Sequence, residues 1–141
     1  MVTTGQLHRL ARLLREVALA GTTDPGEARP APGLVAVTED IAGHPDTTVG
    51  EIATRTGLAQ SLVSTAVAKL KAAGVVQSQP DRNDRRRVRL DVTPAARTHV
   101  FAGRGGRDIT TALHERFPDL TPERIAAIEA LLDQLATELQ P

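Results

Sequence analysis

The segment from residue 48 to residue 93 changes its hydrophobic period at Gly74, and this change limits the possible folds more than any other feature. Before Gly74, apolar residues recur every three or four positions, as on the buried side of a helix. After it, Val88, Leu90 and Val92 alternate with polar residues, as in a half-buried strand. The chain therefore has to combine helices with a short β-hairpin.

Two short helices are expected before Gly74. Thr48 and Glu51 predict a capping box at the start of the first helix: the Thr hydroxyl accepts the Glu51 amide, and the Glu carboxylate reaches back to the cap amide. Gly57 is a typical residue for ending that helix, and the second helix is expected over residues 60–73. Two short helices joined by a tight turn that contains glycine predict a helix-turn-helix.

Apolar spacing predicts further helices at both ends of the chain. An N-terminal helix ends at Gly21, a short helix with Val37 on its buried side closes near Gly43, and Thr93-Pro94 begins a later helix. Glycines at 103, 105 and 106 should kink or split that later helix. Thr121-Pro122 begins the last helix.

Composition narrows the class of protein. Aromatic residues make up 1% of the 141 residues, so the core must be aliphatic, which favours helices. There is no cysteine, which excludes disulfides, thiolate metal sites and cysteine nucleophiles. No apolar run is long enough to span a bilayer, and arginines at 9, 12 and 15 exclude a signal-peptide core. These arginines also resemble a mitochondrial presequence, but a packed helix in a cytoplasmic protein is the expectation that we favour.

The formal net charge is zero, but the charges are unevenly spread. Residues 47–93 carry eight basic and four acidic side chains, a local charge of +4, and the two ends together carry −4. A basic middle between acidic flanks is typical of a DNA-binding segment in a larger scaffold. A solvated charged face remains the alternative.

The expected helix over residues 60–73 presents small polar side chains on the side opposite its apolar face. Such residues let a backbone approach a DNA groove closely, and their hydroxyls can reach phosphates or base edges. An ordinary solvent-exposed face would instead carry mostly Glu, Lys and Arg. The candidate DNA-binding residues of this helix are Gln60, Ser61, Ser64, Thr65 and Lys71.

The turn of the expected hairpin, residues 80–89, is rich in arginine. Arginine suits both phosphate contacts and insertion into a narrow minor groove. A charged hairpin tip is more often merely solvated, but a helix-turn-helix beside it favours a role in DNA binding. The candidate DNA-binding residues of the turn are Arg82, Asp84, Arg85, Arg86 and Arg87.

The order of helix-turn-helix, Gly74-Val75-Val76, a hairpin with Asp84-Arg85-Arg86, and a strand that ends in Val92-Thr93 resembles the MarR family of winged-helix regulators. The resemblance implies that each recognition helix enters a major groove of DNA. It also implies that Arg86 contacts the minor groove and that Asp84 helps to position the wing.

The same resemblance implies a homodimer formed by the terminal helices, and the apolar seams at both chain ends support this, because one chain cannot easily bury both. A palindromic DNA site follows from the two-fold symmetry. A small-molecule effector of unknown class, bound near the junction of dimer helices and DNA-binding lobe, is implied by the resemblance alone. The expected interface residues are Leu7, Leu10, Leu14, Ile125, Ile128, Leu132 and Leu135.

Other chemistries find little support. Asp40 and His44, four residues apart, could face one metal ion, but isolated histidines are usually structural, so neither a metal nor a cofactor is expected. The glycines at 103–106 lack the spacing of a nucleotide loop. No catalytic motif occurs, so an enzyme is not expected.

We therefore predict a mainly α fold with a small β-hairpin wing (α+β): one winged-helix domain over residues 1–141. Residues 34–93 would form the DNA-binding lobe, and residues 1–21 and 94–141 would form a helical dimerisation region. The predicted function is that of a transcriptional regulator, a ligand-responsive repressor that binds a palindromic operator as a homodimer. The alternative is a winged-helix module that binds protein and has no DNA affinity, although an arginine-rich wing argues against it.

Overall fold

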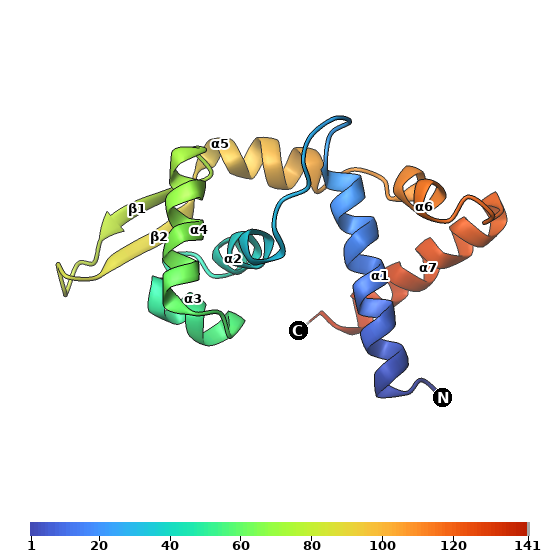
Figure 1. Ribbon diagram of the computed structural model, residues 1–141, viewed down its shortest axis with the longest axis horizontal. Coiled ribbons are helices and arrows are strands. Elements are labelled where there is room, and N and C mark those ends of the chain that lie inside the picture. Colours follow the sequence, from blue (N-terminus) through green and yellow to red (C-terminus); the bar gives the residue numbers. More distant parts are fainter. Residues whose placement is uncertain (141) are drawn as a thin grey trace. The chain divides into compact units, whose positions relative to one another are not determined.

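The computed structural model describes residues 1–140, which form two compact units (Figure 1). The central unit comprises residues 30–105, and the terminal unit combines residues 1–29 with the chain from residue 106 onward. Mainly helical structure with one antiparallel hairpin agrees with the predicted fold class.

The first part of the central unit, up to Val92, is built from three helices and the hairpin. They are α2 (Pro32–Gly43), α3 (Val49–Thr56), α4 (Gln60–Ala72), β1 (Val76–Pro80) and β2 (Val88–Val92). The strands pair antiparallel from Val76 opposite Val92 to Pro80 opposite Val88. On its other side β2 forms an isolated bridge with Thr47, since the amides and carbonyls of Thr47 and Leu90 exchange hydrogen bonds of 3.1 and 2.7 Å. The loop before α3 is thereby attached to the wing.

One aliphatic core holds the central unit together. Ile41, Ile52 and Val63, one from each helix, are completely buried, and Leu90 of β2 is 2% exposed. The helix predicted over residues 60–73 ends at Ala72, and Ala73, its exposed C-cap, does not join the core. Each element therefore contributes its apolar side to one shared interior.

The predicted later helix is split. After Thr93, whose hydroxyl accepts the Ala96 amide, the chain forms α5 (Pro94–Ala96) and continues as a π-helix, η1 (Arg97–Arg104). A Cβ atom on Gly105 would lie 2.4 Å from the carbonyl oxygen of Phe101, so only glycine fits there. The helical path resumes as α6 (Thr110–Arg116), which confirms a break at the glycines.

The terminal unit contains α1 (Thr4–Thr22), α6 and α7 (Pro122–Glu138). Its core consists of Val17, Ala112, Leu113 and Ile125, with Ile128 partly buried beside them. The expected Thr121 cap is present, because the Thr121 hydroxyl accepts the Arg124 amide. Within the described residues, no helix is long and apolar enough to cross a membrane.

Candidate nucleic-acid interface

Helix α4 separates a buried apolar side from an exposed polar one. Val63, Ala66, Val67 and Leu70 lie in the core. All five residues predicted to contact DNA on this helix are exposed; they are Gln60, Ser61, Ser64, Thr65 and Lys71. The structure therefore gathers them on the outer face of one helix.

One hydroxyl on the outer face of α4 is already used within the helix. The Thr65 hydroxyl already donates to the Ser61 carbonyl at 2.9 Å, so it presents mainly lone pairs and a methyl group. A shallow hollow of about 440 Å³ lies where α4 faces the start of α3, and it is lined by Val49, Val67, Ala68, Ser64 and Lys71. This surface suits close approach to a partner more than dense polar contact.

Local capping sets both ends of α3. The Thr48 hydroxyl accepts the Glu51 amide at 3.3 Å, as predicted. The reciprocal half of the capping box is wrong, because the Glu51 carboxylate accepts the Thr48 hydroxyl itself at 3.1 Å instead of the cap amide. Gly57 ends the helix with φ of 72°, the left-handed conformation that glycine adopts without strain.

The wing tip, residues 81–87, is organised by a carboxylate that the sequence reasoning missed. Asp81 is 7% exposed, and its Oδ1 accepts the amides of Asn83 at 2.8 Å and Asp84 at 3.2 Å. Its Oδ2 accepts the Arg89 Nε at 2.7 Å. The backbone amide of Asn83 and the guanidinium of Arg89 lower the pKa of Asp81 to about 2. The PDRND run was read only as a turn, although an Asp that begins such a run is the usual acceptor for the amides that follow it.

Arg89 connects the wing to the rest of the central unit. Its Nη1 donates to the Asp46 carbonyl at 2.8 Å and lies 3.7 Å from a carboxylate oxygen of Glu51 in α3. The hydrogen bond to Asp81 is the main cause that raises the pKa of Arg89 above its ordinary value. Arg89 is one of the polar residues of the predicted alternating strand. Its contacts with Asp46 and Glu51 could not be predicted, because they depend on where the loop before α3 lies.

A second guanidinium ties the helices together. Arg55 of α3 donates through Nε and Nη2 to the carboxylate of Asp40 in α2, at 2.7–3.2 Å, and also to the Thr47 hydroxyl. Asp40, which we weighed as a metal ligand with His44, is thus the ion-pair partner of Arg55. Within the described residues, no group of three or more possible ligands could hold a metal ion.

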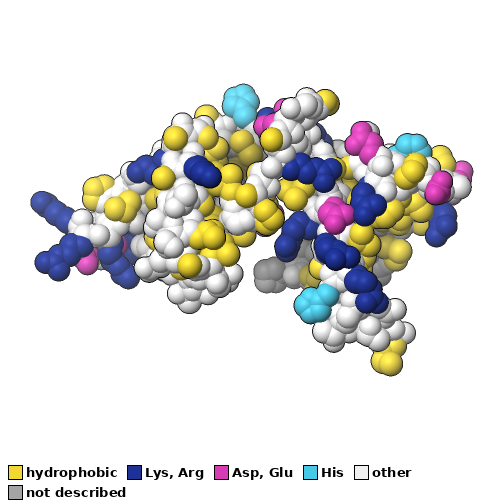
Figure 2. Space-filling model, in the orientation of Figure 1, with side chains coloured by type: hydrophobic (Ala, Val, Ile, Leu, Met, Phe, Trp, Pro, Cys, Tyr) yellow, Lys and Arg dark blue, Asp and Glu magenta, His cyan; other side chains and the backbone are white. Residues whose placement is uncertain are grey.

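The predicted arginines of the wing tip extend into solvent. Arg82, Arg85, Arg86 and Arg87 are all exposed, and within residues 1–140 their guanidinium groups form no ion pair. Figure 2 shows basic side chains gathered at the far end of the hairpin. Asp84 is exposed as well, and its carboxylate accepts the Arg86 amide at 3.0 Å.

The residues predicted at a dimer interface divide into two groups in the terminal unit. Leu7, Leu10 and Leu135 are 45–58% exposed, and Leu14 and Leu132 are partly exposed. Ile125 is 4% exposed inside this unit's own core, so we leave it out of the apolar face. Leu131, at 65%, belongs to the exposed set although the sequence reasoning did not select it.

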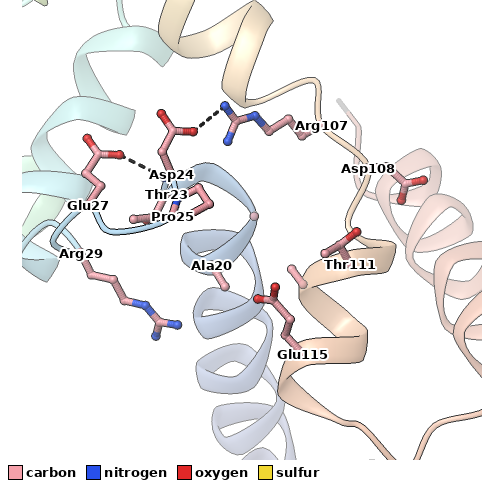
Figure 3. Close-up of a pocket in the computed structure, with 12 residues that line it drawn as sticks. Ala20, Thr23, Asp24, Pro25, Glu27, Arg29, Arg107, Asp108, Thr111 and Glu115 are labelled. Atoms are coloured by element: carbon pink, nitrogen blue, oxygen red, sulfur yellow. Dashed lines mark hydrogen bonds and ion pairs between the residues drawn. The ribbon is translucent and has the colours of Figure 1, made fainter.

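The terminal unit also contains an open cavity of about 540 Å³ between the end of α1, the loop that follows it and the start of α6 (Figure 3). Its lining is polar: Asp24 forms a 2.8 Å ion pair with Arg107, and Arg29 and Glu115 are also present. Asp108 is held by the amide and hydroxyl of Thr110, which lower its pKa. The apolar residues Ala20, Pro25 and Ala112 complete the lining.

Comparison with known proteins gives this geometry a family context. Residues 41–87, which include α3, α4 and the wing tip, match the MarR family. Over 76 residues the chain is 36% identical to YcgE of Bacillus subtilis (strain 168), an uncharacterized HTH-type transcriptional regulator. That match covers 54% of this chain and 46% of YcgE, so the chain spans about half the length of the curated relative.

Solved structures match nearly the whole chain. The apo form of wild-type MarR from E. coli has a TM-score of 0.64 at 20% identity, with 96% of this chain and 98% of that chain covered. FabT of Streptococcus pneumoniae, solved in complex with DNA, has a TM-score of 0.55 at 20% identity over 96% of this chain and 91% of FabT. These matches confirm the predicted winged-helix fold.

Proposed function

We propose that this winged-helix protein is a DNA-binding transcriptional regulator of the MarR family. The observation that carries the proposal is the joint exposure, in one unit, of the polar face of α4 and the unpaired arginines of the wing tip. A helix with small outward side chains can enter a major groove, and guanidinium groups match phosphate oxygens in geometry and charge. The two features supply the sequence-reading and the backbone-binding parts of a DNA interface.

On this proposal, Ser61, Ser64 and Thr65 face the base edges of the major groove. Arg85, Arg86 and Arg87 reach the neighbouring backbone or minor groove, where their charge displaces bound counterions. Gln60, Arg82 and Lys71 lie at the margins of the same surface, and Asp84 holds the Arg86 backbone.

We further propose that the regulator is a homodimer and acts on a palindromic operator in the cytoplasm. Exposed leucines on α1 and on α7 leave apolar surface on both helices, for which a second copy is the simplest cover. Two recognition helices related by a two-fold axis would read half-sites about one helical turn apart. Binding between promoter elements would make the protein a repressor.

An effector is part of the same proposal. A ligand that favours one spacing of the two recognition helices would change operator affinity, because half-site spacing is fixed by the DNA helix. The polar cavity beside Arg29 and Glu115 is the candidate location, and its lining favours a charged ligand. A thermal-shift screen of small cations, anions and zwitterions, compared between the parent chain and Glu115→Gln, tests this location.

The experiment that tests the function is selection from a randomised duplex DNA pool, with affinity measured against salt concentration. We expect a palindromic motif and a steep loss of affinity as salt rises. Weak binding without sequence preference would contradict the proposal and favour a winged-helix module that binds protein.

A further inference from the structure

The exposed arginines of the wing tip lie on a loop that the hairpin alone does not hold. The paired residues end at Pro80 and Val88, and beyond them the backbone adds two bonds, from the Asp81 amide to the Arg87 carbonyl at 3.0 Å and from the Arg87 amide to the Asp84 carbonyl at 2.9 Å. A loop held by so few backbone bonds loses conformational entropy when it is ordered on DNA, and that loss subtracts from affinity. A device that orders the tip before DNA arrives would therefore strengthen binding without touching DNA.

Asp81 has the contacts of such a device. One carboxylate oxygen accepts the two amides at the start of the tip, those of Asn83 and Asp84, while the other accepts the Arg89 Nε at 2.7 Å. Its own backbone closes the far end, because the Asp81 amide donates to the Arg87 carbonyl at 3.0 Å. The side chain thus joins the tip to the paired strand, and it does so while 7% exposed.

Arg89 carries the connection inward. It donates to the Asp46 carbonyl at 2.8 Å and lies 3.7 Å from Glu51, so the tip is linked to the loop before α3 and to α3. Glu51 also lies 3.7 Å from Arg55, whose guanidinium binds Asp40 of α2. A chain of charged contacts therefore runs from the wing tip to the helix-turn-helix.

We propose that Asp81 is a positioning residue for DNA binding: with Arg89 it forms a clasp that holds the arginines of the wing tip in one arrangement in the free protein. The proposal deepens the DNA-binding function and rests on it. It predicts an effect of unusual sign, because removing a negative charge beside four arginines should by charge alone tighten DNA binding. If the clasp determines affinity, removing the Asp81 charge weakens DNA binding instead.

The decisive variant is Asp81→Asn, which has the same shape. The Asn oxygen can still accept the amides of residues 83 and 84, but its NH₂ group faces the Arg89 Nε, a donor against a donor. We expect affinity for the selected duplex to fall about 3- to 10-fold at 0.15 M salt, as rotamer freedom returns to the tip. Asp81→Ala, which also loses the amide bonds, should weaken binding further.

Asp91→Asn is the matched control, because it makes the same change of charge in the same hairpin. The Asp91 carboxylate pairs with Arg97 at 2.7 Å and contacts neither the wing tip nor Arg89. We expect its DNA affinity to be unchanged or up to about 3-fold tighter. Opposite effects of the two Asp→Asn changes would separate positioning from charge.

Two further measurements keep the test decisive. Trypsin should cleave the tip of Asp81→Asn at least about 3-fold faster than that of the parent, a result that needs no DNA. In a chain with Arg85, Arg86 and Arg87 replaced by alanine, Asp81→Asn should have no remaining effect on affinity, because nothing is left to position.

The outcomes are distinct. Equal tip cleavage and equal or tighter DNA binding for Asp81→Asn would overturn the clasp, and so would an unchanged effect in the arginine-free background. A parent chain that binds no duplex would overturn the proposed DNA-binding function and with it the positioning role. Tip cleavage would then still decide whether the Asp81–Arg89 pair orders the wing.

Discussion

The central and terminal units differ in how completely each buries its own apolar residues. In the described part of the chain, the central core contains eleven buried residues drawn from helices and both strands. The terminal core contains four, while Leu7, Leu131 and Leu139 are 58–73% exposed. Apolar area left in water is a loss of stabilisation that association can recover. The central unit therefore buries more of its own apolar residues than the terminal unit, whose exposed leucines are the basis of the proposed dimer.

The largest expected effect comes from placing charge on the apolar face of the terminal unit. Replacing Leu132 and Leu135 together with glutamate should abolish dimerisation, because two carboxylates per chain would have to be buried without partners. Affinity for a full palindrome should fall by about 100-fold or more as the two half-sites lose their linkage. Sedimentation equilibrium and DNA titration measure the two effects.

Gln134→Glu adds charge to an exposed position of the same helix and is the control. It should leave both the dimer and DNA binding intact. A monomeric double variant that still binds the full palindrome tightly would break the link between the terminal unit and DNA recognition.

A matched pair of core variants tests the difference between the central and terminal units directly. Ile41 is completely buried in the central core, and Ile125 is 4% exposed in the terminal core. Each Ile→Ala change should lower the free energy of unfolding by about 2–5 kcal/mol. We expect only Ile125→Ala to weaken dimerisation as well, because it loosens the unit that carries the proposed dimer face; sedimentation velocity should then show a monomer fraction that depends on protein concentration. Equal concentration dependence in the two variants would mean that the units do not differ in this way.

Arg86→Ala probes the charged part of the central unit. Binding should weaken by about tenfold for all DNA sequences alike, and the salt slope should fall by about one, as expected for a lost phosphate contact. Arg124→Ala, which removes an exposed arginine from the terminal unit, is the control. If both variants lose the same affinity, net charge and not the wing determines binding.

The smallest expected effect is on the free energy of unfolding, to which Asp81 contributes in a way that changes only at acidic pH. The pKa of Asp81 is lowered to about 2 in the folded chain, below its ordinary value of 3.8, so its contribution is fully present above that ordinary value. The contribution is lost as the pH falls through about 2. The stability difference between parent and Asp81→Asn should be constant at neutral pH and shrink only in acid. Chemical unfolding at a series of pH values measures it, and a difference that changes near pH 7 would point to another group.

Much of the fold could be predicted because its signals are local. Thr48, Gly57, Thr93-Pro94 and Thr121-Pro122 act on neighbouring backbone groups, and the structure places helix boundaries at each of them. The break at Gly105 also follows from local crowding against Phe101. These features depend on residues within a few positions of one another, so the sequence reports them directly.

The clasp could not be predicted in the same way. Asp81 meets Arg89 eight positions away, and Arg89 meets the Asp46 carbonyl 43 positions away, so the partners follow from topology and not from spacing. Ile125 was likewise assigned to an interface on its helical seam, although α1 and α6 supply enough neighbours to bury it. Periodicity gives the apolar side of a helix but not which neighbour covers it.

The buried and the exposed side of α4 carry different residues, so the exposed side can change while the core stays the same. The side chains that hold the helix in place, Val63, Val67 and Leu70, are separate from the outward Ser61, Ser64 and Thr65. Exposed substitutions of this kind usually alter stability by less than about 0.5 kcal/mol. On the proposed DNA-binding function, operator preference could therefore be altered by replacing three surface residues while the buried side of α4 stays unchanged.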